Sequence, residues 1–341
     1  MAGYVPIDLH RRRSVVMHLA EDGEMLGWRR IANDPGLLVE EVLRHGEAPQ
    51  VAIEATYGWY WTVDELAAAG CDVRLVNTAA VRGLENRRVE NDVKDCELLG
   101  TLMRTGTLPE AWIAPPVVRE WRELVRYRAK LVGVRSGLKA QVHSVLAKLG
   151  IQCGWSDLFG VSGRELLARR LDVDPRLHSA FGQRIESILE LIDVLDAEVA
   201  ELDDSLAHIL RDVKGYDTIQ RIPGVGKVIA AIFCAEIGDV TRFSSASRLV
   251  SWAGLAPRHR ESDTKVRRGR ITKQGSTLVR WAAIEAAQRI GRHHWLAAWK
   301  QQVADRRGST QVARVACARR IIELTFYGLR DGHIRALAGA R

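Results

Sequence analysis

The 341-residue sequence contains only five cysteines, and no two of them have the close spacing of a zinc-binding or redox pair. The five are Cys71, Cys96, Cys153, Cys234 and Cys317. A scattered, odd-numbered set argues against a disulfide framework and favours a reducing compartment. The sequence also lacks an apolar run of roughly 18 residues, which a membrane span needs, and the apolar core of a signal peptide. We therefore expect a cytoplasmic protein with no membrane partner.

Negative charge is in the minority. The chain has 50 Lys and Arg against 42 Asp and Glu, and its formal net charge is +8. The excess is uneven, because residues 185–212 are acidic whereas residues 117–139 and 254–280 are strongly basic. Basic surfaces of this kind suit a polyanion, most often a nucleic acid. With 47% hydrophobic and 27% charged residues, the chain is otherwise an ordinary globular protein, long enough for two or three domains.

Residues 1–114 alternate between strand and helix patterns. The segments YVPID, SVVMHL, MLGWRRI, QVAIEA and DVRLVN are typical of strands. A helix is expected to begin at Asn33-Asp34-Pro35, and the segment WYWTVDELAAA predicts another that ends at Gly70. This order predicts an α/β domain with a mixed sheet.

Residues 115–212 predict two long helices, each with apolar residues at alternating steps of three and four. In the first helix, Arg128 and Arg135 interrupt this heptad seam. The pattern favours an antiparallel coiled-coil arm over direct nucleic-acid binding by the first helix, although both hold if the basic face of the arm meets RNA or DNA. The expected seam residues are Val117, Trp121, Leu124, Arg128, Leu131, Arg135, Leu138, Val142, Val145 and Leu149, then Ile185, Ile188, Ile192, Leu195, Val199, Leu202, Leu206 and Ile209.

Residues 213–341 are expected to be mainly helical. The segment IQRIPGVGKVIAAIFCAEIGD resembles a helix-hairpin-helix, in which the backbone N–H groups around Gly224, Gly226 and Lys227 could hold a phosphate. A turn that merely joins two packed helices explains the same residues equally well.

Four acidic residues of the first region could act together. Asp8 and Glu54 each end a predicted strand, and Asp92 and Asp95 lie three residues apart on one helix face. Capping and surface solvation could explain each acid alone. Together they are the hard oxygen ligands that nucleases of the RNase H type use to hold Mg²⁺ ions about 4 Å apart for attack on a phosphodiester.

The stretch GLAPRHRESDTKVRRGRITKQG, from residue 254 onward, is expected to form a basic loop around Ser262. A serine hydroxyl attacks phosphate only with help from a base, a metal or concentrated positive charge. Cationic side chains here could bind the scissile phosphate and stabilise the charge that develops on it. On this chemistry alone, a solvated loop that only grips a DNA backbone is the slightly better interpretation. The cations are Arg258, Arg260, Lys265, Arg267, Arg268, Arg270 and Lys273.

The spacing of these four acids, followed by IPGVGKVIAAIFCAEIGDVTRFSSASRLVSWAGLAPR and ESDTKVRRGRITKQGSTLVRW, resembles the DEDD transposases of the insertion-sequence "one-ten" family, relatives of the pilin-gene invertases. The resemblance implies a RuvC-like domain over residues 1–114, a coiled-coil over 115–212 and a helical transposase domain over 213–341. It further implies that the acids bind Mg²⁺, with Mn²⁺ as a possible substitute, and that Ser262 attacks DNA.

By the same resemblance, the expected partners are DNA, both at the element ends and at the target, and a structured guide RNA made by the element. The resemblance also implies a prokaryotic cell, in which the active protein is associated with the nucleoid. Strand exchange needs several DNA ends held together, so a homo-oligomer, dimer or tetramer, is expected. Two alternatives remain: a junction-resolving nuclease that uses metal-activated water, and a non-catalytic nucleic-acid-binding scaffold. Five other serines compete with Ser262, and for the first three a helix N-cap is an adequate explanation. The five are Ser244, Ser245, Ser247, Ser251 and Ser276.

Overall fold

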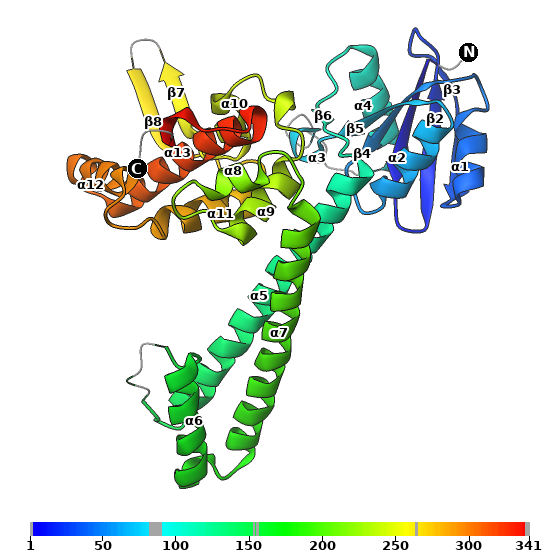
Figure 1. Ribbon diagram of the computed structural model, residues 1–341. Helices are drawn as coiled ribbons and strands as arrows, with labels where there is room; N and C mark the ends of the chain where they lie inside the picture. Colours follow the sequence, from blue (N-terminus) through cyan, green and yellow to red (C-terminus); the bar gives the residue numbers. More distant parts are fainter. Residues whose placement is uncertain (1–2, 82–90, 153, 155–156, 263–264, 338–341) are drawn as a thin grey trace. The chain divides into compact units, whose positions relative to one another are not determined.

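The computed structural model describes residues 3–81, 91–152, 154, 157–262 and 265–337, without the side chains of residues 259–268. The chain divides into two compact units, Met1–Ala114 and Pro115–Arg341. We refer to these as the N-terminal and C-terminal units (Figure 1). Among the described residues, no helix is both long enough and apolar enough to cross a membrane.

The N-terminal unit is built on a six-stranded sheet with the order β3-β2-β1-β4-β5-β6. Strands β1, β4 and β5 are parallel, whereas β2, β3 and β6 run antiparallel to the strands they pair with. The mixed α/β sheet that the sequence predicts is therefore confirmed. The strands are β1 (Tyr4–Leu9), β2 (Arg13–Leu19), β3 (Met25–Ala32), β4 (Gln50–Glu54), β5 (Asp72–Val76) and β6 (Glu110–Ala111).

Helices cover both faces of this sheet. On one face, Ile7 and Ile53 belong to the same buried cluster as Leu38 and Leu66 from two of the helices. On the other face, Cys96 packs with buried residues of β2. Because side chains alternate along a strand, the central strands are buried on both sides, which explains their nearly continuous apolar sequences. The described helices of this unit are α1 (Pro35–Val42), α2 (Trp59–Ala68), α3 (Thr78–Val81) and α4 (Asp92–Arg104).

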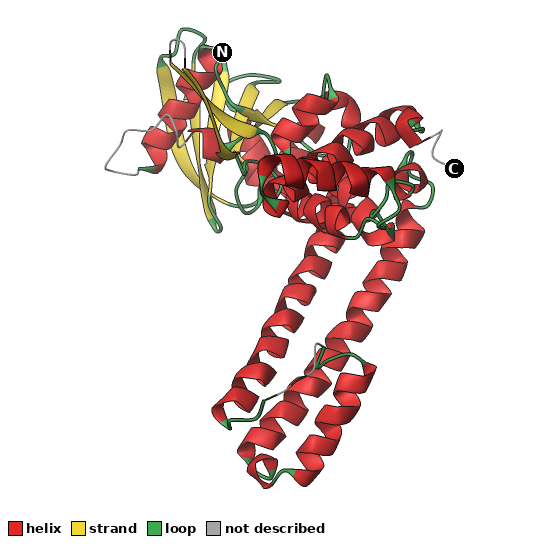
Figure 2. Cartoon of the chain, turned by 90° about the vertical axis from the view of Figure 1, so that its left-hand side faces the viewer, coloured by secondary structure: helices red, strands yellow, loops and turns green. Residues whose placement is uncertain are grey.

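The C-terminal unit begins with two long helices, α5 (Pro116–Lys148) and α7 (Ala180–Leu210) (Figure 2). Arg128 pairs with Asp203 and Arg135 with Asp196, so numbering rises along one helix as it falls along the other. The helices therefore pack antiparallel. Helix α6 (Val161–Val173) and the 3₁₀ turn η1 (Pro175–Leu177) lie between them in sequence. The two arginines that interrupt the seam are each paired with a carboxylate of the opposite helix.

The buried stripe of this helix pair follows the expected seam in its middle and departs from it at the base. Val142, Ile185 and Ile192 are buried as expected, whereas Val117 is 48% exposed and Ile209 is 41% exposed. Leu210 is buried in place of Ile209. At the base, both helices also contact a third helix, α9 (Lys227–Ile237), which buries a different side of each. The structure thus shows a packed helix pair, and regular coiled-coil geometry stays a prediction.

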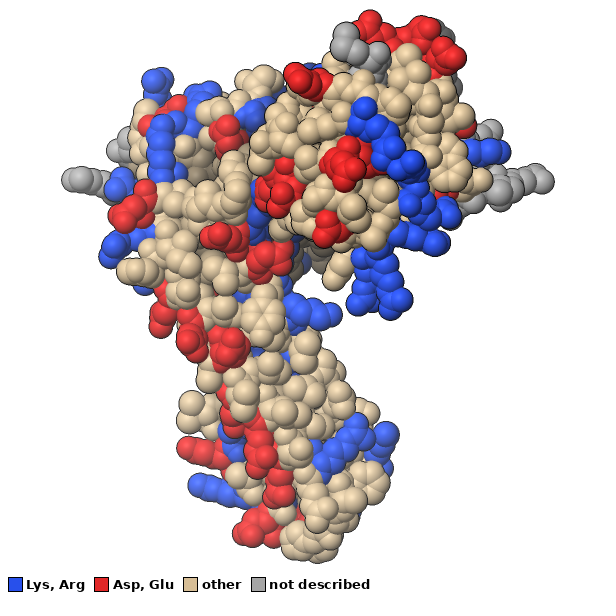
Figure 3. Space-filling model, turned by 90° about the vertical axis from the view of Figure 1, so that its right-hand side faces the viewer, with Lys and Arg blue, Asp and Glu red and all other residues tan. Residues whose placement is uncertain are grey.

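Acidic side chains gather along α7. Figure 3 shows Asp and Glu side chains running down the long helix pair. Glu186, Glu190 and Glu201 are among the exposed acids of α7. This distribution agrees with the acidic composition of residues 185–212 and makes α7 a poor surface for a polyanion.

The remaining helices of the C-terminal unit pack on α9 or on α13 (Thr310–Asp331) and enclose a large buried cluster. Phe233 and Phe326 are among its fully buried side chains. The mainly helical character expected for this region is confirmed. The other helices are α8 (Tyr216–Gln220), η2 (Val240–Arg242), α10 (Ala246–Trp252), α11 (Thr277–Gln288), α12 (Trp295–Arg307) and η3 (Arg335–Leu337).

The expectation of a basic loop after residue 254 is wrong in one respect. Strands β7 (Pro257–Ser262) and β8 (Lys265–Ile271) pair antiparallel and form a two-stranded ribbon. Two strands satisfy each other's backbone N–H and C=O groups, so a segment with few apolar residues can be extended and paired without a core of its own.

Candidate metal-binding cleft and serine-bearing ribbon

The structure brings the four predicted acids into one cleft of the N-terminal unit, lined by Asp8, Glu54, Asp92 and Asp95 among others. β1 and β4 are adjacent parallel strands, and Ile7 of β1 pairs with Ile53 of β4. The next residue of each strand, Asp8 and Glu54, therefore reaches the same edge and the same face of the sheet. Carboxyl ends of parallel strands are a common position for ligand sites in α/β sheets.

Helix α4 supplies the other two acids from its first turn. The Asn91 side chain accepts a hydrogen bond from the Val93 N–H at 3.0 Å and caps the helix. Asp92 and Asp95 lie where the partial positive charge of a helix N-terminus stabilises carboxylates. Behind them, Cys96 is fully buried, and its thiol donates to the Val15 carbonyl oxygen at 3.6 Å. This contact holds the first turn of α4 against β2.

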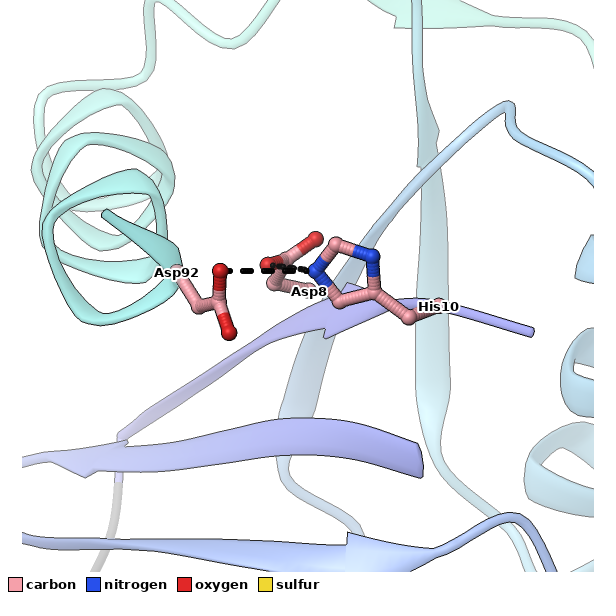
Figure 4. A group of neighbouring side chains, drawn as sticks. All are labelled: Asp8, His10 and Asp92. Atoms are coloured by element: carbon pink, nitrogen blue, oxygen red, sulfur yellow. Dashed lines mark hydrogen bonds and ion pairs between the residues drawn. The ribbon is translucent and has the colours of Figure 1, made fainter. Parts of the chain in front are cut away.

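A histidine that sequence reasoning missed contacts two of the acids (Figure 4). His10 Nε2 is 2.9 Å from Asp8 Oδ2 and 3.5 Å from Asp92 Oδ1. Potential ligand atoms of these three residues all lie within 4.8 Å of one another. One signal could have found His10: it stands two residues after Asp8, the spacing that keeps side chains on one face of an extended chain.

The environments of Asp8 and Asp92 differ. Burial raises the pKa of Asp8, and the neighbouring Asp92 carboxylate adds to the rise, while His10 opposes it. Burial also opposes ionisation of Asp92, but His10 and Arg30 prevail and lower its pKa. Arg30 Nη2 donates to Asp92 Oδ2 at 3.0 Å. Two carboxylates held this close favour a shared cation.

Other residues of the cleft were also absent from the sequence predictions. Thr56, Tyr57, Thr78 and Arg11 line it beside the acids. Tyr57 is 83% exposed. Arg30 reaches the site from β3, which is separated from β4 by β2 and β1, so only the strand order reveals its place.

The donor set fits a divalent cation. Four carboxylates offer hard oxygen ligands, which Mg²⁺ and Mn²⁺ prefer, and His10 adds a nitrogen donor that suits Mn²⁺. The partial burial of Asp8, whose side chain is 15% exposed, makes its charge costly without a cation. Of these side chains, Asp8, His10 and Asp92 lie close enough together to share one ion, and Glu54 and Asp95 line the same cleft.

Ser262 belongs to the C-terminal unit, where it ends β7 and pairs with Lys265 at the start of β8. Arg260 pairs with Arg267, and Arg268 with His259, so the ribbon holds basic residues on both strands. The backbones of these residues are placed, whereas their side chains lie outside what the structure describes. Three further predicted cations, Arg258, Arg270 and Lys273, are exposed.

Two glycines fix the base of the ribbon. Gly254 and Gly275 both have φ of +70°, which favours glycine. A Cβ on Gly254 would lie 2.1 Å from the Gln274 oxygen, and one on Gly275 would lie 1.8 Å from the Trp252 oxygen. The chain segments before and after the ribbon therefore approach each other more closely than any residue with a Cβ would permit.

Arg280 of α11 reinforces this base. Its Nη1 donates to the carbonyl oxygens of Ala253, Gln274 and Gly275 at 3.2, 2.6 and 3.1 Å. The competing Ser276 accepts a hydrogen bond from the Val279 N–H and caps α11, and Ser245 caps α10 in the same way. The cap expected upstream of Ser262 is therefore confirmed at Ser245, and Ser276 has a structural role.

The glycine turn before α9 has a structural explanation as well. Gly224 has φ of +85°, and a Cβ there would lie 2.1 Å from the Ala286 oxygen of α11. Gly226 is the N-cap of α9, where no side chain makes a capping hydrogen bond, and Lys227 is exposed at the first helical position. Close packing accounts for Gly224, and phosphate binding by Gly226 and Lys227 stays a prediction.

Comparisons with known proteins agree with this geometry. A family model described as "Transposase IS116/IS110/IS902 family" matches residues 216–303, and a DEDD model of the IS110 group, described as "Transposase", matches residues 5–151. The chain is 25% identical over 250 residues to a probable family 20 transposase of Pseudomonas aeruginosa, covering 71% of each chain.

Two further relatives match over a longer part of the chain. The chain is 24% identical to a putative transposase of Sinorhizobium fredii over 288 residues, which cover 83% of this chain and 73% of the relative. It is 21% identical to the transposase for insertion sequence element IS1111A of Coxiella burnetii over 295 residues, which cover 84% of this chain and 79% of the relative. The match to a DEDD domain and the acidic cleft together indicate use of a divalent metal. The chain belongs to the IS110 family of DEDD transposases.

Proposed function

We propose that this transposase is an RNA-guided, site-specific DNA recombinase that cuts and rejoins DNA with two sets of residues: the four acids of the N-terminal cleft and Ser262 of the ribbon. The observation that carries the proposal is the convergence of Asp8, Glu54, Asp92 and Asp95 in one cleft. Acids from two strand ends and a helix also support a RuvC-like, RNase H-type interpretation of the N-terminal unit.

Within the cleft, the carboxylates would hold Mg²⁺, which supplies charge stabilisation to a phosphodiester under attack. Asp8 and Asp92 both contact His10 Nε2, and ligand atoms of the three residues lie within 4.8 Å of one another. Arg30 holds the Asp92 side chain in place and keeps it ionised. Exposed Arg11 lies beside the acids, where it can hold a phosphate oxygen of the DNA.

Ser262 would act as the nucleophile. Its Oγ forms a bond to phosphorus, the bond from phosphorus to a sugar oxygen breaks, and the serine proton leaves to solvent while the released sugar oxygen takes up a proton. The phosphoserine ester conserves the bond energy, so a DNA hydroxyl can later attack it and release the serine. Ser262 and Lys265 are directly paired across the ribbon, which places a cation next to the nucleophile in the backbone register.

The basic ribbon and the glycine turn would bind nucleic acid backbone. Arg258, Arg270 and Lys273 are exposed and can neutralise phosphates. An element-encoded guide RNA would select the DNA, and a dimer or tetramer would hold the several ends. The apolar seam of the long helix pair is buried within one chain, so copies would meet through other surfaces of this pair.

Trapping a covalent adduct tests the serine step. Incubation with Mg²⁺, guide RNA and labelled DNA containing the element end should give a labelled protein band on a denaturing gel. Ser262→Ala should give none. Ser276→Ala should keep the band, because Ser276 only caps α11. An adduct retained by Ser262→Ala would contradict the nucleophile assignment.

The same reaction separates the alternatives. Cleavage without any adduct would favour a water-using nuclease, and no cleavage in Mg²⁺ would favour a binding scaffold. Asp8→Asn and Asp92→Asn should abolish cleavage with little effect on folding, since each removes ligand charge at nearly constant volume. Glu97→Gln on the exposed side of α4 is the matched control and should cleave normally.

A further inference from the structure

Helix α13 carries a long surface groove that none of the predicted sites uses. Two adjoining hollows lie along it and share Arg320. One is lined by Trp295 and Trp299 of α12 together with Arg319, and the other by Tyr327 and Arg330. We call the two together the aromatic–arginine groove. Helices α12 and α13 lie side by side and contact each other (Figure 1).

Large aromatic side chains are exposed in this groove. Trp295 is 37% exposed and Tyr327 is 41% exposed. The Arg330 guanidinium lies 5.3 Å from the centre of the Tyr327 ring and 4.9 Å from that of Phe326, a distance at which cations are attracted to ring faces. The groove therefore presents flat surfaces with cations beside them.

The groove is also positively charged. Arg320 pairs with Glu323 at 2.8 Å and Arg330 with Asp331 at 2.7 Å. Arg319 forms no ion pair or hydrogen bond with any part of the chain that the structure describes. Four arginines, including Arg335, outnumber the two carboxylates, so the groove complements an anion.

The length of the groove matches a short strand. Its lining on α13 runs from Ala316 to Asp331, 15 residues apart, which is about 22 Å at roughly 1.5 Å per residue. Stacked nucleotides rise about 3.4 Å each, so about six would fit.

We propose that the aromatic–arginine groove binds a single-stranded segment of nucleic acid, with bases stacked on Trp295 and Tyr327 and phosphates held by Arg319 and Arg335. Exposed rings can stack only on bases that are not already stacked in a duplex, and sequence-tolerant single-strand sites combine such rings with a basic track. An acidic protein segment would use the arginines and leave the rings unexplained. The inference rests on the proposed function in that nucleic acid is the substrate, and it assigns a new contact for the unpaired part.

Fluorescence anisotropy with a labelled 20-nucleotide single strand tests the groove. Tyr327→Ala and Trp295→Ala should each weaken binding by about fivefold or more, since one base stack is lost. Tyr127→Ala is the matched control, because Tyr127 of α5 is similarly exposed at 48% and lies outside the groove. Tyr327→Phe keeps the ring and should bind as the wild type does.

Salt dependence tests the cation. Arg319→Ala should make the slope of log affinity against log salt less steep by about 0.7, the value for one phosphate contact to a single strand. The binding assay is run with oligo(dT) and oligo(U) of equal length, and the tighter of the two identifies whether the segment is DNA or RNA. A fully paired duplex serves as the comparison, and Tyr327→Ala should leave its binding unchanged.

Unchanged single-strand binding by Tyr327→Ala and Arg319→Ala would overturn the inference, as would a change in oligomeric state without a change in single-strand binding. If a variant misfolds, photo-crosslinking of 4-thiouridine-containing RNA to the wild type decides: crosslinks within residues 295–335 support the groove, and crosslinks only elsewhere refute it. Failure of the proposed function would be a separate result. It would appear as a missing DNA adduct, while the groove variants would still bind single strands more weakly than the wild type.

Discussion

Arg280→Ala should loosen the base of the ribbon that carries Ser262. Arg280 makes three hydrogen bonds to carbonyl oxygens of the segments that enter and leave the ribbon, and a fourth to Thr277 Oγ1 at 3.1 Å. A hydrogen bond to a charged group contributes about 1.5–3 kcal/mol. In Arg280→Ala the carbonyl oxygens can bond to water instead, so each lost hydrogen bond should cost only about 1 kcal/mol. The ribbon base should then be less stable by roughly 2–3 kcal/mol in total.

Amide hydrogen exchange measures this loss directly. The Thr272 N–H donates to the Ala256 oxygen at 2.9 Å, and the Lys273 N–H donates to the Gly254 oxygen at 3.0 Å. Both bonds close the base of the ribbon. A loss of roughly 2–3 kcal/mol should speed exchange at these two amides about 30- to 150-fold, because each 1.4 kcal/mol is tenfold.

Arg289→Ala is the matched control. Arg289 is the C-cap residue of the same helix and pairs with Glu285, one turn away, at 3.0 Å on the surface. Such a pair contributes only about 0.3–0.5 kcal/mol, so exchange at Thr272 and Lys273 should change less than about twofold. Equal exchange at these amides in Arg280→Ala and Arg289→Ala would refute the view that Arg280 fixes the base.

Three further perturbations test other parts of the chain. Gly224→Ala should lower the free energy of unfolding by about 2 kcal/mol or more, because φ is +85° and a Cβ would lie 2.1 Å from a backbone oxygen. The control Gly226→Ala meets no atom within 4 Å and should lower it by less than about 1 kcal/mol. Urea denaturation measures both free energies. His10→Ala should reduce Mn²⁺ affinity more than Mg²⁺ affinity in calorimetric titrations, since imidazole suits the transition metal; equal losses would show that His10 is no ligand. The double variant Leu195→Asp, Leu202→Asp should disrupt the helix pair or its assembly, as measured by light scattering. Leu191→Asp, at a residue that is 51% exposed, should not. Normal assembly and folding of the double variant would mean that the seam is misidentified.

The acids of the cleft could be predicted because each depends on local patterns. Asp8 and Glu54 end strands that are recognisable from apolar runs, and Asp92 and Asp95 share a helix face by their spacing of three. Arg30 and Thr78 could not be predicted in the same way. Their positions depend on which strands are neighbours and on where the chain passes after β5, and neither follows from a pattern within one segment.

The ribbon was missed for a different reason. Strand prediction relies on alternation of apolar and polar residues, and Pro257–Ser262 contains no such alternation. Its pairing depends on backbone hydrogen bonds and on the closed base of the ribbon. Neither produces a periodic pattern of apolar residues in the sequence. The ends of the helix pair shifted from the heptad seam because α9 contacts both helices there, and a third helix changes which side of each is buried.

Both candidate sites place their reactive residues at strand ends. Asp8 and Glu54 stand at the ends of strands in a six-stranded sheet that helices cover on both faces. Substitutions in the surrounding core should therefore lower the stability of the unit before they move the two carboxylates. Ser262 stands at the end of a ribbon of only two strands. Among the described residues, the ribbon is held by the backbone hydrogen bonds between β7 and β8. A two-stranded ribbon is marginally stable alone. The position of Ser262 therefore depends on the base formed by Gly254, Gly275 and Arg280, and changes there should affect strand cleavage while metal binding by the N-terminal unit is unchanged.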